Sequence, residues 1–112
     1  MGSAPTSYPR NKIKILLLEN ISERAVGELH DGGYGEVEKI GGALSEAELC
    51  EAVRGVHLLG IRSKTQITKN VIEAADKLLA IGCFCIGVNQ VDLKAATEKG
   101  VAVFNIAKRG LG

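Results

Sequence analysis

The chain has 112 residues, of which 46% are hydrophobic and 24% are charged, and its formal net charge is +1. This composition is typical of one folded soluble domain and excludes a disordered chain and a membrane span. The balanced charge offers no basic surface for a phosphate backbone, so neither nucleic acid nor a membrane is an expected partner.

The first half of the chain predicts two strands and two helices. Residues 13–18 are branched and apolar, which suits a buried strand of a parallel sheet. A helix begins near Ser22 and ends at Gly32, since glycine commonly terminates helices. Residues 36–40 form a second strand, and Ser45 with Glu48 three residues later is a capping-box pattern that starts a second helix.

The second half predicts three more strands and two more helices. A strand at residues 56–61 precedes a helix that Thr68 caps and that carries Leu78. A fourth strand begins at Leu79, a helix covers residues 91–99, and a fifth strand covers residues 101–105. Such alternation predicts an α/β fold, with an open, doubly wound parallel sheet of flavodoxin-like character, about five strands and four helices.

The cysteines and histidines give no sign of a metal site or a catalytic pair. Cys83 and Cys85 are one residue apart in an apolar segment and Cys50 is distant from them, a spacing that fits no common zinc or redox signature. His30 and His57 have no carboxylate or nucleophile partner in the sequence, so structural roles are expected for both. We therefore expect no metal, and reduced cysteines are typical of a cytoplasmic protein.

Polar side chains follow several predicted strands, at the sheet edge where open α/β sheets bind ligands. After the third strand, Arg62, Ser63 and Lys64 combine a planar guanidinium, a hydroxyl and a point charge, which suit a carboxylate or a phosphate. By itself this cluster would fit a solvated turn equally well. The glycines at residues 32–35 follow a helix rather than a strand and match no dinucleotide or Walker spacing. A small anionic metabolite is the predicted partner.

Four segments, residues 14–19, 61–65, 80–93 and 103–105, resemble matching segments of the D-2-hydroxyacid dehydrogenase family, in particular its phosphoglycerate dehydrogenases. The resemblance implies the strand order 2-1-3-4-5. It also implies NAD-dependent oxidation of 3-phosphoglycerate to 3-phosphohydroxypyruvate, the first step of serine biosynthesis.

By the same resemblance, Arg62, Ser63 and Asn105 would bind the substrate, and further loop contacts would come from Lys64, Gly87, Val88 and Asn89. Gly41 occupies a position where the family often has a lysine, so one phosphate contact is expected to be missing or shifted.

The resemblance also implies a domain organisation. Residues 1–12 would be a flexible arm, residues 13–105 the N-terminal part of the substrate-binding (catalytic) domain, and residues 106–112 a divergent tail, with the NAD-binding domain absent. Because the family's cofactor fingerprint and catalytic residues belong to that missing part, we expect this chain alone to bind no NAD and to contain no catalytic residue. The expected function is a truncated, inactive substrate-binding domain. The alternative is a stand-alone acidic-metabolite-binding or regulatory interaction module without catalysis. A homo-oligomer, or association with a full-length enzyme, is the expected assembly of the chain.

Overall fold

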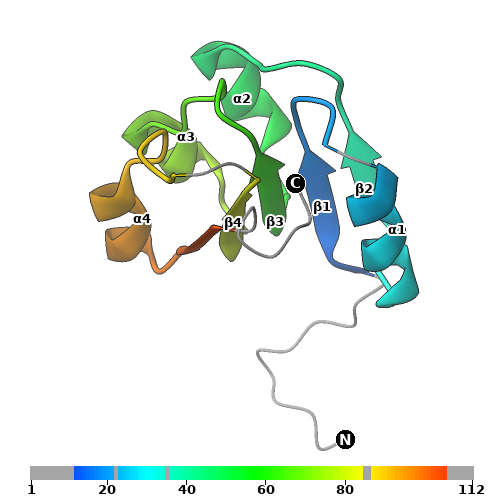
Figure 1. Cartoon of the computed structure of the whole chain (residues 1–112). Helices are drawn as coiled ribbons and strands as arrows, with labels where there is room; N and C mark the ends of the chain where they lie inside the picture. Colours follow the sequence, from blue (N-terminus) through cyan, green and yellow to red (C-terminus); the bar gives the residue numbers. More distant parts are fainter. Residues whose placement is uncertain (1–11, 22, 35, 85–86, 106–112) are drawn as a thin grey trace, which may run out of the picture.

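The computed structural model describes residues 12–21, 23–34, 36–84 and 87–105, so the predicted arm, apart from Lys12, and the predicted tail lie outside the described residues. The strands are β1 (Lys14–Leu17), β2 (Glu36–Lys39), β3 (Leu58–Ile61), β4 (Ala80–Cys83) and β5 (Ala102–Asn105). The helices are α1 (Glu23–Asp31), α2 (Glu46–Ala52), α3 (Lys69–Ala74) and α4 (Leu93–Lys99). All neighbouring strands are parallel, in the order β2-β1-β3-β4-β5 (Figure 1). The predicted α/β fold and strand order are confirmed.

Each face of the sheet has its own hydrophobic core, because successive side chains of a strand point to opposite faces. Leu16 of β1 is buried on the face that carries α2, α3 and α4, where it belongs to the same cluster as Leu49 of α2. Ile15 and Leu17 are buried on the other face, in a cluster against which Val26 of α1 packs. Helix α1 lies beside β2, apart from the row formed by the other three helices (Figure 1). Helices on both faces confirm the doubly wound arrangement.

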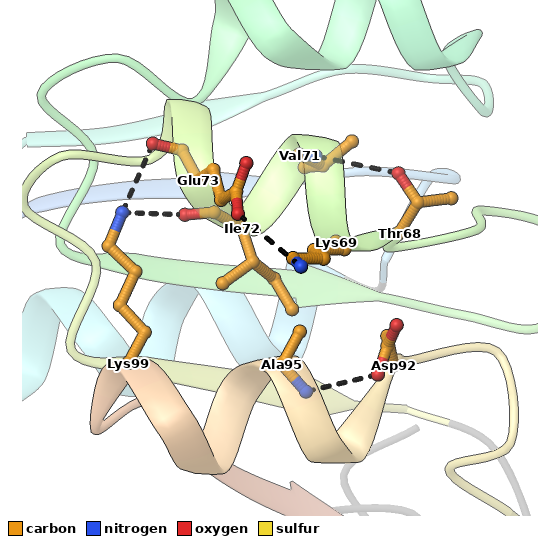
Figure 2. Close-up of polar contacts among 8 residues, drawn as sticks. All are labelled: Thr68, Lys69, Val71, Ile72, Glu73, Asp92, Ala95 and Lys99. Carbon is orange, nitrogen blue, oxygen red and sulfur yellow. Dashed lines mark hydrogen bonds and ion pairs between the residues drawn. The ribbon is translucent and has the colours of Figure 1, made fainter.

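The predicted helix caps at the starts of α2 and α3 are present. Ser45 Oγ accepts a hydrogen bond from the N–H of Glu48 at 3.3 Å, and Glu48 Oε1 accepts one from the N–H of Ser45 at 3.0 Å. Thr68 Oγ1 accepts from the N–H of Val71 at 3.4 Å (Figure 2). These acceptors satisfy N–H groups that the first turn of a helix leaves without partners.

Helices α3 and α4 are shorter than predicted. Ala75 still donates to carbonyls of the last turn of α3, but its ψ of 83° takes the chain out of the helix. Leu78 lies beyond the helix and is nevertheless buried, so its helical spacing reflects packing against the core. Helix α4 starts after Asp92, whose carboxylate accepts from the N–H of Ala95 at 3.0 Å (Figure 2).

Lys99 at the end of α4 links this helix to α3. Its ammonium donates to the carbonyl oxygens of Ile72 at 2.8 Å and Glu73 at 3.1 Å (Figure 2). The last carbonyls of a helix carry partial negative charge, so a cation is favourable there. This contact fixes the position of α4 relative to α3.

Gly60 of β3 lies close to three apolar side chains on the face of the sheet opposite α2, α3 and α4. A Cβ atom at this position would lie 2.6 Å from Leu17 Cδ2, 3.1 Å from Phe84 Cε1 and 3.2 Å from Ile21 Cδ1. The first distance is shorter than carbon atoms tolerate, and all three neighbouring side chains are themselves buried. Only glycine fits here without displacing them.

We expect the substitution Gly60→Ala to lower the free energy of unfolding by about 1–3 kcal/mol, the usual cost of overpacking a core. Gly27→Ala is the matched control, because a Cβ at Gly27 in α1 would meet no atom within 4 Å. Alanine there should stabilise the helix by about 0.5–1 kcal/mol. Urea unfolding followed by circular dichroism measures both changes. An unchanged midpoint for Gly60→Ala would show that the neighbouring side chains can move aside.

Candidate anion-binding site

The loops after β1, β3 and β4 meet at the carboxyl edge of the sheet, because these three strands are neighbours in it. Arg62 and Ser63 follow β3, and both side chains are exposed. They line a cavity of about 480 Å³ and also a second cavity of about 300 Å³. The two cavities therefore share Arg62 and Ser63.

The larger cavity is bordered by the loop after β4. Its other lining residues supply amides, a glycine and one aromatic ring: Gln66, Phe84, Gly87, Asn89 and Gln90. Two of the residues predicted to contact a ligand, Gly87 and Asn89, thus lie beside Arg62. Val88 instead packs against the hydrophobic core.

The smaller cavity is bordered by the loop before α2. Besides Arg62 and Ser63, it is lined by Lys64, Glu19 and residues 41–43, which have small side chains or none. A Cβ at Gly41 would meet nothing within 4 Å. The space beside this glycine, where the family often has a lysine, is therefore open. Within the described ranges, no carboxylate pairs with the side chains of Arg62 or Lys64. Both cations are therefore available to an anion.

Glu19 holds the loop that carries these cations. Its Oε2 accepts hydrogen bonds from the N–H groups of Arg62 at 2.8 Å and Thr65 at 3.0 Å, and its Oε1 accepts one from the N–H of Lys64 at 2.9 Å. Burial by itself would raise the pKa of this carboxyl. The adjacent Thr65 hydroxyl and the hydrogen bonds from the three backbone N–H groups outweigh burial and lower the pKa below its ordinary value.

The backbone at Glu19 is strained. Glu19 has a φ of 61° and Asn20 a φ of 55°, both in the left-handed region. For a glutamate this region costs about 1–2 kcal/mol, whereas asparagine adopts it more readily. The N–H of Glu19 donates to the carbonyl of Gly42 at 3.2 Å, and the N–H of Asn20 donates to that of Ile40 at 3.2 Å. These bonds tie the strained turn to the loop before α2, which also borders the smaller cavity.

Gln90 holds the same loop from the other side. It is a buried polar residue, and its Nε2 donates to the carbonyl oxygen of Arg62 at 2.9 Å. In the sequence, Glu19 and Gln90 are only polar residues that follow predicted strands. Neither roles nor partners could be inferred, because both side chains bind backbone groups distant in the sequence.

Other candidate residues lie away from the two cavities. Asn105 ends β5 and lines neither cavity, so its predicted contact with a ligand stays a prediction. His57 is buried, and its Nδ1 accepts from the N–H of Lys14 at 3.0 Å, which is a structural contact. No cluster of three or more His, Cys, Asp or Glu able to hold a metal ion occurs among the described residues.

The described residues do not fit a dinucleotide. Dinucleotide sites need a glycine-rich turn after the first strand, where the pyrophosphate meets backbone N–H groups. The described turn after β1, residues 18–21, contains no glycine, and Glu19 in it accepts hydrogen bonds from the loop after β3. No helix in the described part of the chain has the length and apolar character needed to cross a bilayer.

Residues 15–109 match the family model of the D-isomer specific 2-hydroxyacid dehydrogenase, catalytic domain. The match covers most of the chain, and this chain belongs to that family.

Similar proteins with curated names are D-3-phosphoglycerate dehydrogenases. The chain is 53% identical to D-3-phosphoglycerate dehydrogenase 1 of Saccharomyces cerevisiae over 98 residues, which are 88% of this chain and 21% of the yeast protein. It is 49% identical to the Escherichia coli enzyme over 102 residues, 91% of this chain and 25% of that enzyme. A solved Pyrococcus horikoshii structure superimposes with a TM-score of 0.75 and 31% identity, over 81% of this chain and 26% of that one. The chain thus spans a quarter or less of the curated relatives named here.

The lowered pKa of Glu19 predicts an acid-sensitive contribution to stability. The unfolded carboxyl titrates near its ordinary value of 4.5, and the folded one titrates lower. Ionised Glu19 therefore stabilises the fold fully above that ordinary value, and this contribution is lost as the pH falls through the folded pKa. The difference in unfolding free energy between wild type and Glu19→Gln should shrink as the pH is lowered from neutral into this range.

Urea unfolding of both proteins over a series of pH values tests this expectation. Comparison with Glu19→Gln is needed because Glu48 and Asp76 also have lowered pKa values, and they contribute equally to both proteins. A difference that does not vary with pH would contradict the assignment of the titration to Glu19.

Proposed function

We propose that this chain is the substrate-binding part of a D-3-phosphoglycerate dehydrogenase, and that its anion-binding site takes 3-phosphoglycerate. The observation that carries the proposal is the position of Arg62 and Ser63, which line two adjoining cavities at the carboxyl edge of the sheet. The similarity to D-3-phosphoglycerate dehydrogenases over nearly the whole chain supports the choice of substrate.

The chemistry of the site suits a molecule with an anionic group at each end. 3-Phosphoglycerate carries a carboxylate at one end and a phosphate at the other. The guanidinium of Arg62 can bind either group through two parallel hydrogen bonds, and Lys64 adds a second positive charge in the smaller cavity. Ser63 and the amides of Gln66 and Asn89 supply neutral hydrogen-bonding groups in the larger cavity.

Hydride transfer would require parts that the described residues do not provide. NAD, when bound to an enzyme of this kind, accepts the hydride from the substrate carbon. We propose that NAD binding, the catalytic groups and the oligomeric contacts belong to a full-length cytoplasmic enzyme. The role of the described residues is then to bind and orient the acidic substrate.

We expect the purified chain to bind 3-phosphoglycerate and Arg62→Ala to weaken that binding by about 10- to 100-fold. This corresponds to about 1.5–3 kcal/mol for hydrogen bonds to a charged group. Arg62→Lys should lose less, because it keeps the charge but not the planar fork. Isothermal titration calorimetry measures the affinity, and the formation of NADH in the presence of NAD measures any hydride transfer.

Arg54→Ala is the matched control. Arg54 is an exposed arginine just after α2, 3.8 Å from Glu51, so its removal changes the net charge equally without altering either cavity. An equal loss of affinity in both variants would mean that the affinity for 3-phosphoglycerate depends only on the net charge of the protein. The proposed site would then be wrong. Undetectable binding to wild type would overturn the proposal for this chain.

A further inference from the structure

We propose that Glu19 and Gln90 are positioning residues, which hold the main chain of Arg62 from two sides so that its guanidinium lies between the two cavities. This inference rests on the proposed function, because it assigns the way in which the same anion site is organised.

Both hydrogen-bonding groups of the Arg62 main chain are bound by side chains. The N–H donates to Glu19 Oε2 at 2.8 Å, and the carbonyl oxygen accepts from Gln90 Nε2 at 2.9 Å. The side chain of Arg62 is exposed and extends from a backbone unit that is fixed at both ends. A loop residue held in this way loses little conformational freedom when its side chain binds a ligand.

The two positioning residues lie in the loops that follow β1 and β4, the strands on either side of β3. Leu17 of β1 pairs with Gly60 of β3, so Glu19 and Arg62 each lie two residues beyond a paired position. Gln90 belongs to the loop after β4, the other neighbour of β3, and its own carbonyl accepts from the N–H of Ile67 at 2.9 Å. The loop at residues 62–67 is thus held near its beginning by Glu19 and at its end by Gln90.

The negative charge of Glu19 is otherwise unfavourable beside an anion site. Glu19 lines the smaller cavity together with Arg62 and Lys64, so its carboxylate would repel a bound anion. The carboxylate is instead directed at three backbone N–H groups of the loop. Charge repulsion and positioning therefore predict opposite signs for the effect of Glu19→Gln on anion binding.

The experiment titrates the full chain with 3-phosphoglycerate and follows proton-nitrogen correlation spectra. The variants are Glu19→Gln, Gln90→Leu, each of these combined with Arg62→Ala, and Glu38→Gln as the control. Glu38 lies exposed on the edge strand β2, so this control makes the same charge change away from the site. Gln90→Leu removes the donor without adding a charge. Amide hydrogen exchange of Arg62, Lys64 and Thr65 in the free protein reports the hydrogen bonds to Glu19.

Positioning predicts that Glu19→Gln and Gln90→Leu each weaken binding about tenfold, although the first removes a negative charge, and that Glu38→Gln changes it less than twofold. In the Arg62→Ala background either further change should alter affinity less than about twofold, because coupled residues are not additive. The three amides should exchange faster in Glu19→Gln.

Equal or tighter binding of 3-phosphoglycerate by Glu19→Gln would overturn the inference. So would a tenfold loss of affinity from either change in the Arg62→Ala background. Unchanged amide exchange of Arg62, Lys64 and Thr65 in Glu19→Gln would also contradict it. The proposed function fails separately. If wild type binds no 3-phosphoglycerate while the three amides lose protection in Glu19→Gln, the substrate is wrong and the positioning of Arg62 by Glu19 stands.

Discussion

β1 and β3 pair in parallel with Leu17 opposite Gly60, and this contact brings the loops that follow them side by side. The absence of a side chain at Gly60 leaves room for the side chains of Leu17, Ile21 and Phe84, which would lie within 3.2 Å of a Cβ atom there. With the register fixed in this way, the carboxylate of Glu19 reaches the backbone of the loop after β3. The packing of this strand pair therefore sets the position of the loop that carries Arg62 relative to Glu19.

The site concentrates positive charge at Arg62 and Lys64, and the small net charge of the whole chain gives no indication of this concentration. Arg62 and Lys64 both line the smaller cavity, and the nearby carboxylate of Glu19 binds backbone N–H groups of the same loop. The carboxylate thus stabilises the loop that presents the cations without forming an ion pair with them. Binding of an anion to the guanidinium would break no ion pair with any residue that the structure describes.

Local sequence patterns predicted most of the fold. The alternation of apolar runs, the capping box at Ser45 and the cap at Thr68 depend on residues a few positions apart, and all are present in the structure. The end of α3 was predicted less well, because Leu78 is buried by tertiary packing after the helix has ended. Periodicity reports which side chains are buried and does not report where the backbone leaves the helix.

The cluster at residues 62–64 could also be found from the sequence, since its cations and hydroxyl are adjacent in the chain. The parts that shape it could not. Glu19 bonds to N–H groups 43, 45 and 46 residues away, and Gln90 bonds to a carbonyl 28 residues away. Every residue has backbone hydrogen-bonding groups, so the sequence does not indicate which of them a distant side chain will bind.

These separations along the chain also bear on folding. Contacts between distant residues require the intervening chain to close into loops, which costs conformational entropy. The three loops of the site therefore come together only when β1, β3 and β4 have assembled, and a partly folded chain lacks the site. A ligand that binds there selects the folded state, so its free energy of binding adds to the stability of the whole sheet.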